Sequence, residues 1–98
     1  MSEASTRRLL WWLLLSTRGG PMRIRLLRVI SAKPLNANQL AKELGVDYTT
    51  VRHHLDILVK NGVLEAVGEK YGTIFYLSKS LTENSGLVKE ILDESGKK

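Results

Sequence analysis

The sequence predicts a small, mainly helical domain that carries one β-hairpin. Two short amphipathic segments meet at Gly45 with almost no linker, and two β-prone runs follow directly, separated by the glycine-bounded turn 68–72. A chain of 98 residues fits one such domain, with enough Leu, Ile and Val for a single core. We expect an N-terminal apolar helix over residues 1–20, the central domain over 21–80, and a C-terminal helix with a polar tail over 81–98.

The first of the two amphipathic helices begins at a predicted cap. Asn36 can accept a hydrogen bond from the backbone N–H of Gln39, and the Gln39 side chain can reach back to the backbone of Asn36. Gly45 follows where the end of a helix needs a positive φ, and Asp47 can cap the next helix. Two helices joined this closely are typical of a helix-turn-helix.

The second helix is expected over residues 48–61, with two different faces. Val51, Leu55 and Leu58 recur at spacings of four and three, so they form one apolar stripe. The opposite face offers hydroxyls, an arginine and a histidine, which can reach phosphates and base edges in a major groove. The residues of this helix predicted to contact DNA are Tyr48, Thr49, Thr50, Arg52, His53 and Asp56. The alternative is an ordinary solvated face of a helical hairpin.

Residues 63–79 predict the hairpin, in which Phe75 and Leu77 share one side and should point into the core. A helix-turn-helix followed directly by a hairpin is the order of a winged helix domain, with the turn as the wing. Lys70 and Tyr71 at its tip are predicted to contact a phosphate or a minor groove. The alternative is a plain hairpin turn, because Glu69 offsets the charge of Lys70.

The pattern Val51, His54, Leu55 and Leu58, with Gly62 and two apolar residues after it, resembles the recognition helix and wing start of ArsR-type winged helix regulators. The resemblance extends from about residue 21 to residue 77. It implies a winged helix fold with additional N- and C-terminal helices. It also implies binding of double-stranded DNA, as in the compact ArsR-like factors of archaea.

Metal sensing, which part of that family performs with cysteines and histidine clusters, is not expected here. The chain has no cysteine, and adjacent residues on a helix differ in direction by about 100°, so His53 and His54 cannot easily share an ion. We predict no metal and no cofactor. His54 is expected to be partly buried and hydrogen-bonded, whereas His53 points toward DNA.

The charge pattern also favours a polyanionic partner. The formal net charge is +5, and residues 1–35 hold seven Lys or Arg against one acidic residue. Pro21 is placed to open a helix whose arginines leave the core face. In related winged domains the N-terminus of this helix lies near the DNA backbone, so the resemblance implies that Thr17, Arg18 and Arg23 contact phosphates. The alternative is that these arginines only solubilise the surface.

Residues 9–15 form a run of seven apolar residues. The run is too short for a transmembrane helix, which needs about 20 residues, and no signal-peptide cleavage site follows it. A helix that is apolar all round is normally buried on several sides, and one small domain has no evident room for it. We therefore expect a homodimer, although the last helix could instead cap its own core. The predicted interface residues are Leu10, Trp11, Trp12, Leu14, Leu87, Val88, Ile91 and Leu92.

Enzymatic motifs are not found: the sequence has no P-loop, GxGxxG, HExxH or nucleophile elbow, so we expect no enzyme. The predicted function is sequence-specific DNA binding by a dimeric transcriptional regulator in the cytoplasm, with no membrane association and with potential contact to the transcription machinery. One alternative is a winged helix protein–protein interaction module in a transcription or replication assembly, docking through the Trp-Leu segment. Another is nonspecific coating of chromatin.

Overall fold

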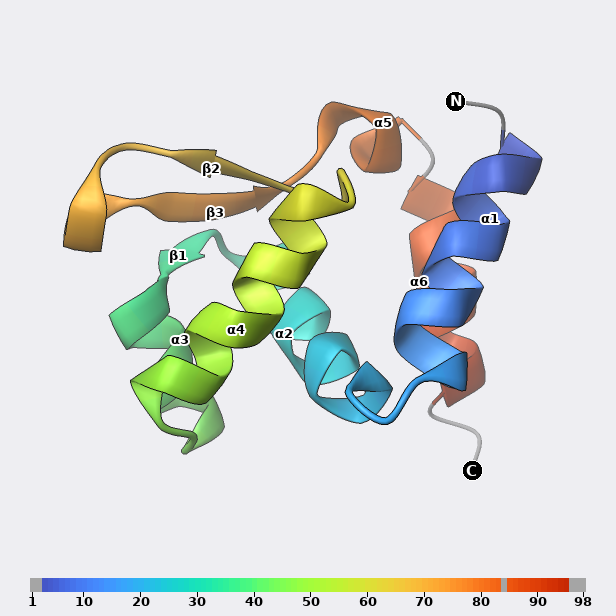
Figure 1. Ribbon diagram of the computed structural model, residues 1–98. Coiled ribbons are helices and arrows are strands. Elements are labelled where there is room, and N and C mark those ends of the chain that lie inside the picture. Colours follow the sequence, from blue (N-terminus) through green and yellow to red (C-terminus); the bar gives the residue numbers. More distant parts are fainter. Residues whose placement is uncertain (1–2, 84, 96–98) are drawn as a thin grey trace.

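Helices form most of the structure, a computed structural model that describes residues 3–83 and 85–95, and a small sheet lies against them (Figure 1). The predicted fold class is confirmed. The elements in chain order are α1 (Glu3–Trp11), the π-helical turn η1 (Trp12–Ser16), α2 (Gly20–Ala32), β1 (Leu35–Asn36), α3 (Ala37–Leu44), α4 (Tyr48–Lys60), β2 (Leu64–Val67), the 3₁₀ turn η2 (Lys70–Gly72), β3 (Ile74–Leu77), α5 (Lys79–Thr82) and α6 (Ser85–Ser95).

The helix-turn-helix is formed by α3 and α4, with the predicted caps in place. The backbone N–H of Gln39 donates to Asn36 Oδ1 at 2.8 Å, and the backbone N–H of Asn36 donates to Gln39 Oε1 at 2.9 Å. Gly45 ends α3 with a φ of 67°. Asp47 caps α4 by accepting from the backbone N–H of Thr50 at 3.0 Å. These four residues therefore fix the start of α3, the turn and the start of α4.

The sheet has three antiparallel strands in the order β1-β3-β2. The predicted hairpin is β2 and β3, with Leu64 opposite Leu77 and Val67 opposite Ile74. Phe75 is buried and Leu77 is half-buried against the core, as expected. The strand β1 was not predicted, because its two residues are too few to form a sequence pattern.

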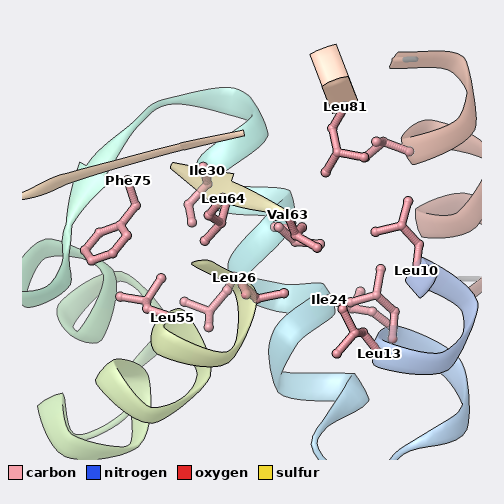
Figure 2. Packing of buried hydrophobic residues seen from close by; sticks show 14 of the residues in the cluster. Leu10, Leu13, Ile24, Leu26, Ile30, Leu55, Val63, Leu64, Phe75 and Leu81 are labelled. Atoms are coloured by element: carbon pink, nitrogen blue, oxygen red, sulfur yellow. The ribbon is translucent and has the colours of Figure 1, made fainter. Parts of the chain in front are cut away.

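One hydrophobic core extends over two sides of α2 (Figure 2). On one side, Leu26 of α2 lies near Leu55 of α4 and Phe75 of β3; on the other, Ile24 lies beside leucines of α1 and η1. Leu26 and Leu55 have no exposed area. The winged domain and the terminal helices therefore share a continuous core.

The expectation that one domain cannot bury the apolar run 9–15 is wrong for Leu10, Leu13 and Leu14, which are each at most 2% exposed within a single chain. Helices α1 and α6 lie side by side at one flank of the molecule, where Arg7 Nη1 and Glu90 Oε2 are 2.6 Å apart (Figure 1). Helix α6 therefore helps to bury the apolar run, which was expected from the sequence to be buried against a second chain.

The predicted dimer interface needs a corresponding correction. Six of its eight side chains are already buried in the protomer: Leu10, Leu14, Leu87, Val88, Ile91 and Leu92. Trp11 and Trp12 remain 51% and 55% exposed. The π-helical turn after α1 directs Leu13 and Leu14 inward, so the tryptophans take the outer side.

The connection between β3 and α6 contains the short helix α5, whose Leu81 is buried. No helix in residues 3–83 and 85–95 has the length and apolar character needed to cross a membrane.

Gly20 provides a test of this packing, because a Cβ there would overlap the carbonyl oxygen of Leu14. We predict that Gly20→Ala lowers the free energy of unfolding by about 1–3 kcal/mol, since backbone must move to make room. In the matched control Gly86→Ala, no atom of the part of the chain that the structure describes lies within 4 Å of the new Cβ, and a helical alanine should be neutral or stabilising by up to about 1 kcal/mol. Urea denaturation followed by circular dichroism measures both, and equal effects would contradict the packing.

Candidate nucleic-acid interface

The exposed face of α4 is set by its buried face. Val51, Leu55 and Leu58 are fully buried, so the residues between them turn outward. Of the six predicted DNA contacts on this helix, Thr49, His53 and Asp56 are exposed, whereas Tyr48, Thr50 and Arg52 are half-buried. The helix therefore presents hydroxyl, imidazole, guanidinium and carboxylate groups along one side.

Arg52 is held in a defined position on that side. Its Nη2 donates to Asp56 Oδ1 at 3.0 Å, one helical turn away, and its guanidinium carbon lies 5.8 Å from the centre of the Phe75 ring. A shallow groove of about 310 Å³ separates this part of α4 from the wing, with Lys60 and Thr73 also in its lining. An arginine whose guanidinium lies over a ring and beside the groove is preorganised to donate to a base edge.

The first turn of α4 has a structural role as well as exposed hydroxyls. Thr50 Oγ1 donates to Asp47 Oδ1 at 2.7 Å, so this hydroxyl belongs to the helix cap. The hydrogen bonds from the Thr50 side chain and backbone lower the pKa of Asp47, which keeps the cap ionised. Thr49 is the hydroxyl of this turn that faces solvent.

The tip of the wing contacts the N-terminal end of α4. The Tyr48 and Tyr71 ring centres lie 6.1 Å apart with an interplanar angle of 49°. The tip itself is the 3₁₀ turn η2, in which Lys70 adopts a positive φ of 51° and Tyr71 is 72% exposed. The turn is predicted from the sequence, but this ring contact, which joins residues 23 positions apart, is not. As a result, Lys70, Tyr71 and the start of α4 form one surface.

Arg18 is exposed in the loop before α2, but the prediction that Arg23 leaves the core face is wrong. Arg23 is only 5% exposed. Its Nε donates to the carbonyl oxygen of Leu13 at 3.0 Å, its Nη2 donates to Thr17 Oγ1, and its Nη1 lies 3.2 Å from His54 Nδ1. The turn η1 covers this side of α2, and nothing in the local pattern of α2 indicates that. Arg23 is therefore not placed for direct contact with a phosphate.

His54 lies as expected. His54 is half-buried and hydrogen-bonded to Arg23, whereas His53 is exposed, and the two rings meet edge to face at 5.2 Å. Burial lowers the pKa of His54, and the charges of Arg23 and His53 lower it further. Within residues 3–83 and 85–95, no three His, Asp or Glu side chains gather closely enough to hold a metal ion.

Residues 19–67, half of the chain, match the family model of the helix-turn-helix domain, and the chain belongs to this family. The match runs from the start of α2 to the end of β2. It therefore contains both helices of the helix-turn-helix and the first strand of the wing. No curated protein matches the chain.

Several solved structures have a similar fold. The antimony-specific transcriptional repressor AntR is 19% identical, with a TM-score of 0.71, over 98% of this chain and 85% of that one. The homodimeric winged helix-turn-helix DNA-binding domain of a possible ArsR-family regulator from Mycobacterium bovis is 18% identical, with a TM-score of 0.69, over 96% of this chain and 89% of that one. The Zα domain of PKZ from Carassius auratus, solved in complex with Z-DNA, is 24% identical, with a TM-score of 0.58, over 62% of this chain and 98% of that one. The chain thus has the winged helix fold.

Proposed function

We propose that the protein binds double-stranded DNA sequence-specifically, as a dimeric transcriptional regulator of the ArsR-like type. The observation that carries the proposal is the single surface formed by the exposed side of α4 and the wing tip, with Arg52 held toward the groove between them. Membership of the helix-turn-helix domain family supports it. So do the similar folds of a repressor and of a domain bound to Z-DNA.

In this proposal α4 enters a major groove. The base edges would be contacted by Thr49, Arg52, His53 and Asp56. In the major groove these edges expose a pattern of hydrogen-bond donors and acceptors that is unique to each base pair. Tyr48 and Thr50 lie at the phosphate-facing start of the helix, where Thr50 acts mainly through the cap. Three residues outside α4 are proposed to contact the backbone: Lys70 and Tyr71 from the wing, and Arg18 from the loop before α2.

The dimer would form through the exposed tryptophans of α1 and η1. Trp11 and Trp12 are more than half exposed although tryptophan is largely buried in most folds. A groove of about 290 Å³ lies beside Trp11, lined by Arg7, Glu90, Ile91 and Glu94, so helix α6 would contribute its outer side. A two-fold dimer would place two recognition helices about 34 Å apart, which is one turn of DNA.

A second candidate function is a winged helix protein–protein interaction module. The same two exposed indoles favour it, because a large exposed aromatic pair marks interaction sites in general. The two functions differ in what α4 does: a DNA-binding protein needs Arg52 for affinity, whereas an interaction module that docks through Trp11 and Trp12 does not.

The base-reading role of Arg52 can be tested with oligonucleotides selected from a random pool by the wild-type protein. We predict that Arg52→Ala weakens specific binding by about 1–3 kcal/mol, because a bidentate contact to a base is lost. Lys89→Ala, which removes one positive charge from the exposed side of α6, is the control and should have little effect. Undiminished binding by a folded Arg52→Ala, Thr49→Ala double mutant would reject the role of α4 and favour the interaction module.

Salt dependence tests the contacts to phosphate. If a dimer neutralises about six phosphates, the logarithm of the binding constant should fall against the logarithm of salt concentration with a slope near −5. Titrations of one oligonucleotide at several salt concentrations measure this slope. A slope close to zero would mean that the basic residues only solubilise the surface.

The dimer is tested by replacing the exposed rings. We predict that a Trp11→Ser, Trp12→Ser double mutant is a folded monomer, because each buried indole removes roughly 150–250 Å² from water in the interface. Sedimentation velocity at micromolar concentration measures the oligomeric state. Tyr76→Ser, which removes an exposed ring from the wing, should leave it unchanged. A wild-type chain that sediments as a monomer would show that the tryptophans are not a dimer interface.

A further inference from the structure

Arg23 is a buried cation. It is 5% exposed, and no carboxylate in residues 3–83 and 85–95 pairs with it. Burying a guanidinium is costly unless its N–H groups are hydrogen-bonded. They are bonded here to Leu13, Thr17 and His54, and burial lowers the pKa of Arg23. These acceptors come from η1, from the loop that follows it and from α4.

The space around this side chain is closed by Gly19. A Cβ on Gly19 would lie 2.6 Å from Arg23 Nη1 and 2.9 Å from His54 Cε1, closer than real side-chain contacts allow. The backbone between η1 and α2 therefore passes directly over the Arg23–His54 contact. The neighbouring Arg18, a proposed phosphate contact, is positioned by the same stretch of backbone.

The contact requires neutral His54. A guanidinium can only donate, so His54 Nδ1 must accept, and the imidazole proton resides on Nε2. A proton on Nδ1 would remove the acceptor and place a second positive charge against Arg23. The charged and titratable groups that act on His54 are Arg23 from α2 and His53 from α4, and the hydroxyl of Thr17 in the loop accepts a hydrogen bond from Arg23. No carboxylate among these groups could stabilise the imidazolium.

We propose that Arg23 is a positioning residue for DNA binding, which holds the N-terminal segment (residues 3–19) against α4 through His54, and that protonation of His54 releases this contact. The proposal rests on the proposed function, because α4 is taken as the DNA-reading helix. The N-terminal segment carries Arg18 and both tryptophans. Releasing it from α4 therefore separates a phosphate contact and the dimer surface from the recognition helix.

The sign of the pH effect distinguishes this proposal from simple electrostatics. Protonating histidines adds positive charge, which by itself strengthens binding to DNA as the pH falls. The lowered pKa of His54 means that the folded chain binds fewer protons than the unfolded chain, so the stabilisation is present above about pH 6.5 and is lost as the pH falls below it. The Arg23–His54 contact thus predicts weaker binding in acid.

The binding experiment compares variants at constant ionic strength between about pH 7.5 and about pH 5.5, a range that spans the ordinary histidine pKa. We expect wild-type affinity for a selected oligonucleotide to fall roughly threefold or more on acidification. His54→Asn should keep its affinity across the range, because Asn Oδ1 can replace Nδ1 as acceptor and takes no proton. The matched control His53→Asn, one residue away on the exposed face, should retain the loss in acid.

Variants of Arg23 provide the second comparison. Arg23→Lys keeps the charge but cannot serve three acceptors with a planar fork, so it should bind more weakly and lose the acid response. Lys89→Met, which removes a charge from the exposed side of α6, should bind like the wild type and keep that response. Circular dichroism at both pH values confirms that each variant compared is folded.

Nitrogen-detected NMR of the imidazoles provides a readout that needs no DNA. At neutral pH His54 should be the Nε2–H tautomer, should titrate below the ordinary histidine range, and should titrate higher in Arg23→Met. An Nδ1–H tautomer would overturn the contact. Tighter wild-type binding in acid, or the same acid loss in His54→Asn, would overturn the positioning role. If the wild type selects no DNA sequence, the proposed function fails, and the NMR titration still decides whether the contact exists.

Discussion

The structure depends on the need to cover α2 on two sides. Ile24, Leu26, Leu27 and Ile30 are all buried, and residues one apart on a helix differ in direction by about 100°, so no single neighbour can cover them. Helix α4 and the sheet cover one side, and α1, η1 and α6 cover the other. The terminal helices are therefore part of the core on which the helix-turn-helix rests. Truncating them would expose apolar surface of α2.

This arrangement explains why Arg23 is buried. It lies where the terminal helices meet the winged domain, and η1 closes over it. The last carbonyl groups of a helix lack partners within the helix, so Leu13 can accept from both Arg23 and Thr17. The carbonyl oxygen of Leu13 in η1 thus receives the donors that it lacks within the helix, and the buried guanidinium of Arg23 receives an acceptor in place of a counterion. The same side chain reaches His54, which couples the packing of the terminal helices to α4.

The parts of the fold that the sequence predicted are those fixed by neighbours in the chain. The capping box at Asn36, the positive φ of Gly45 and the buried stripe of α4 each depend on residues within one or two helical turns. The burial of Arg23, the pairing of β1 with β3 and the cover that α6 gives to α1 join residues far apart. Leu10 and Leu14 show the consequence: their pattern indicated burial correctly, but it could not distinguish α6 of the same chain from a second chain.

The folded structure also divides the basic residues of the N-terminal third into two groups. Four of the seven have internal partners: Arg7 pairs with Glu90, Arg23 is buried, and Arg25 and Arg28 donate to the carbonyl oxygens of Leu44 and Leu92. Arg8, Arg18 and Lys33 have exposed side chains without a hydrogen bond or ion pair to the described residues. A hydrogen bond to a carbonyl oxygen does not neutralise an arginine, so most of the seven basic residues still attract a polyanion at long range. Few of these side chains remain to grip phosphates directly, and the sequence preference of the proposed DNA binding must therefore come from the face of α4.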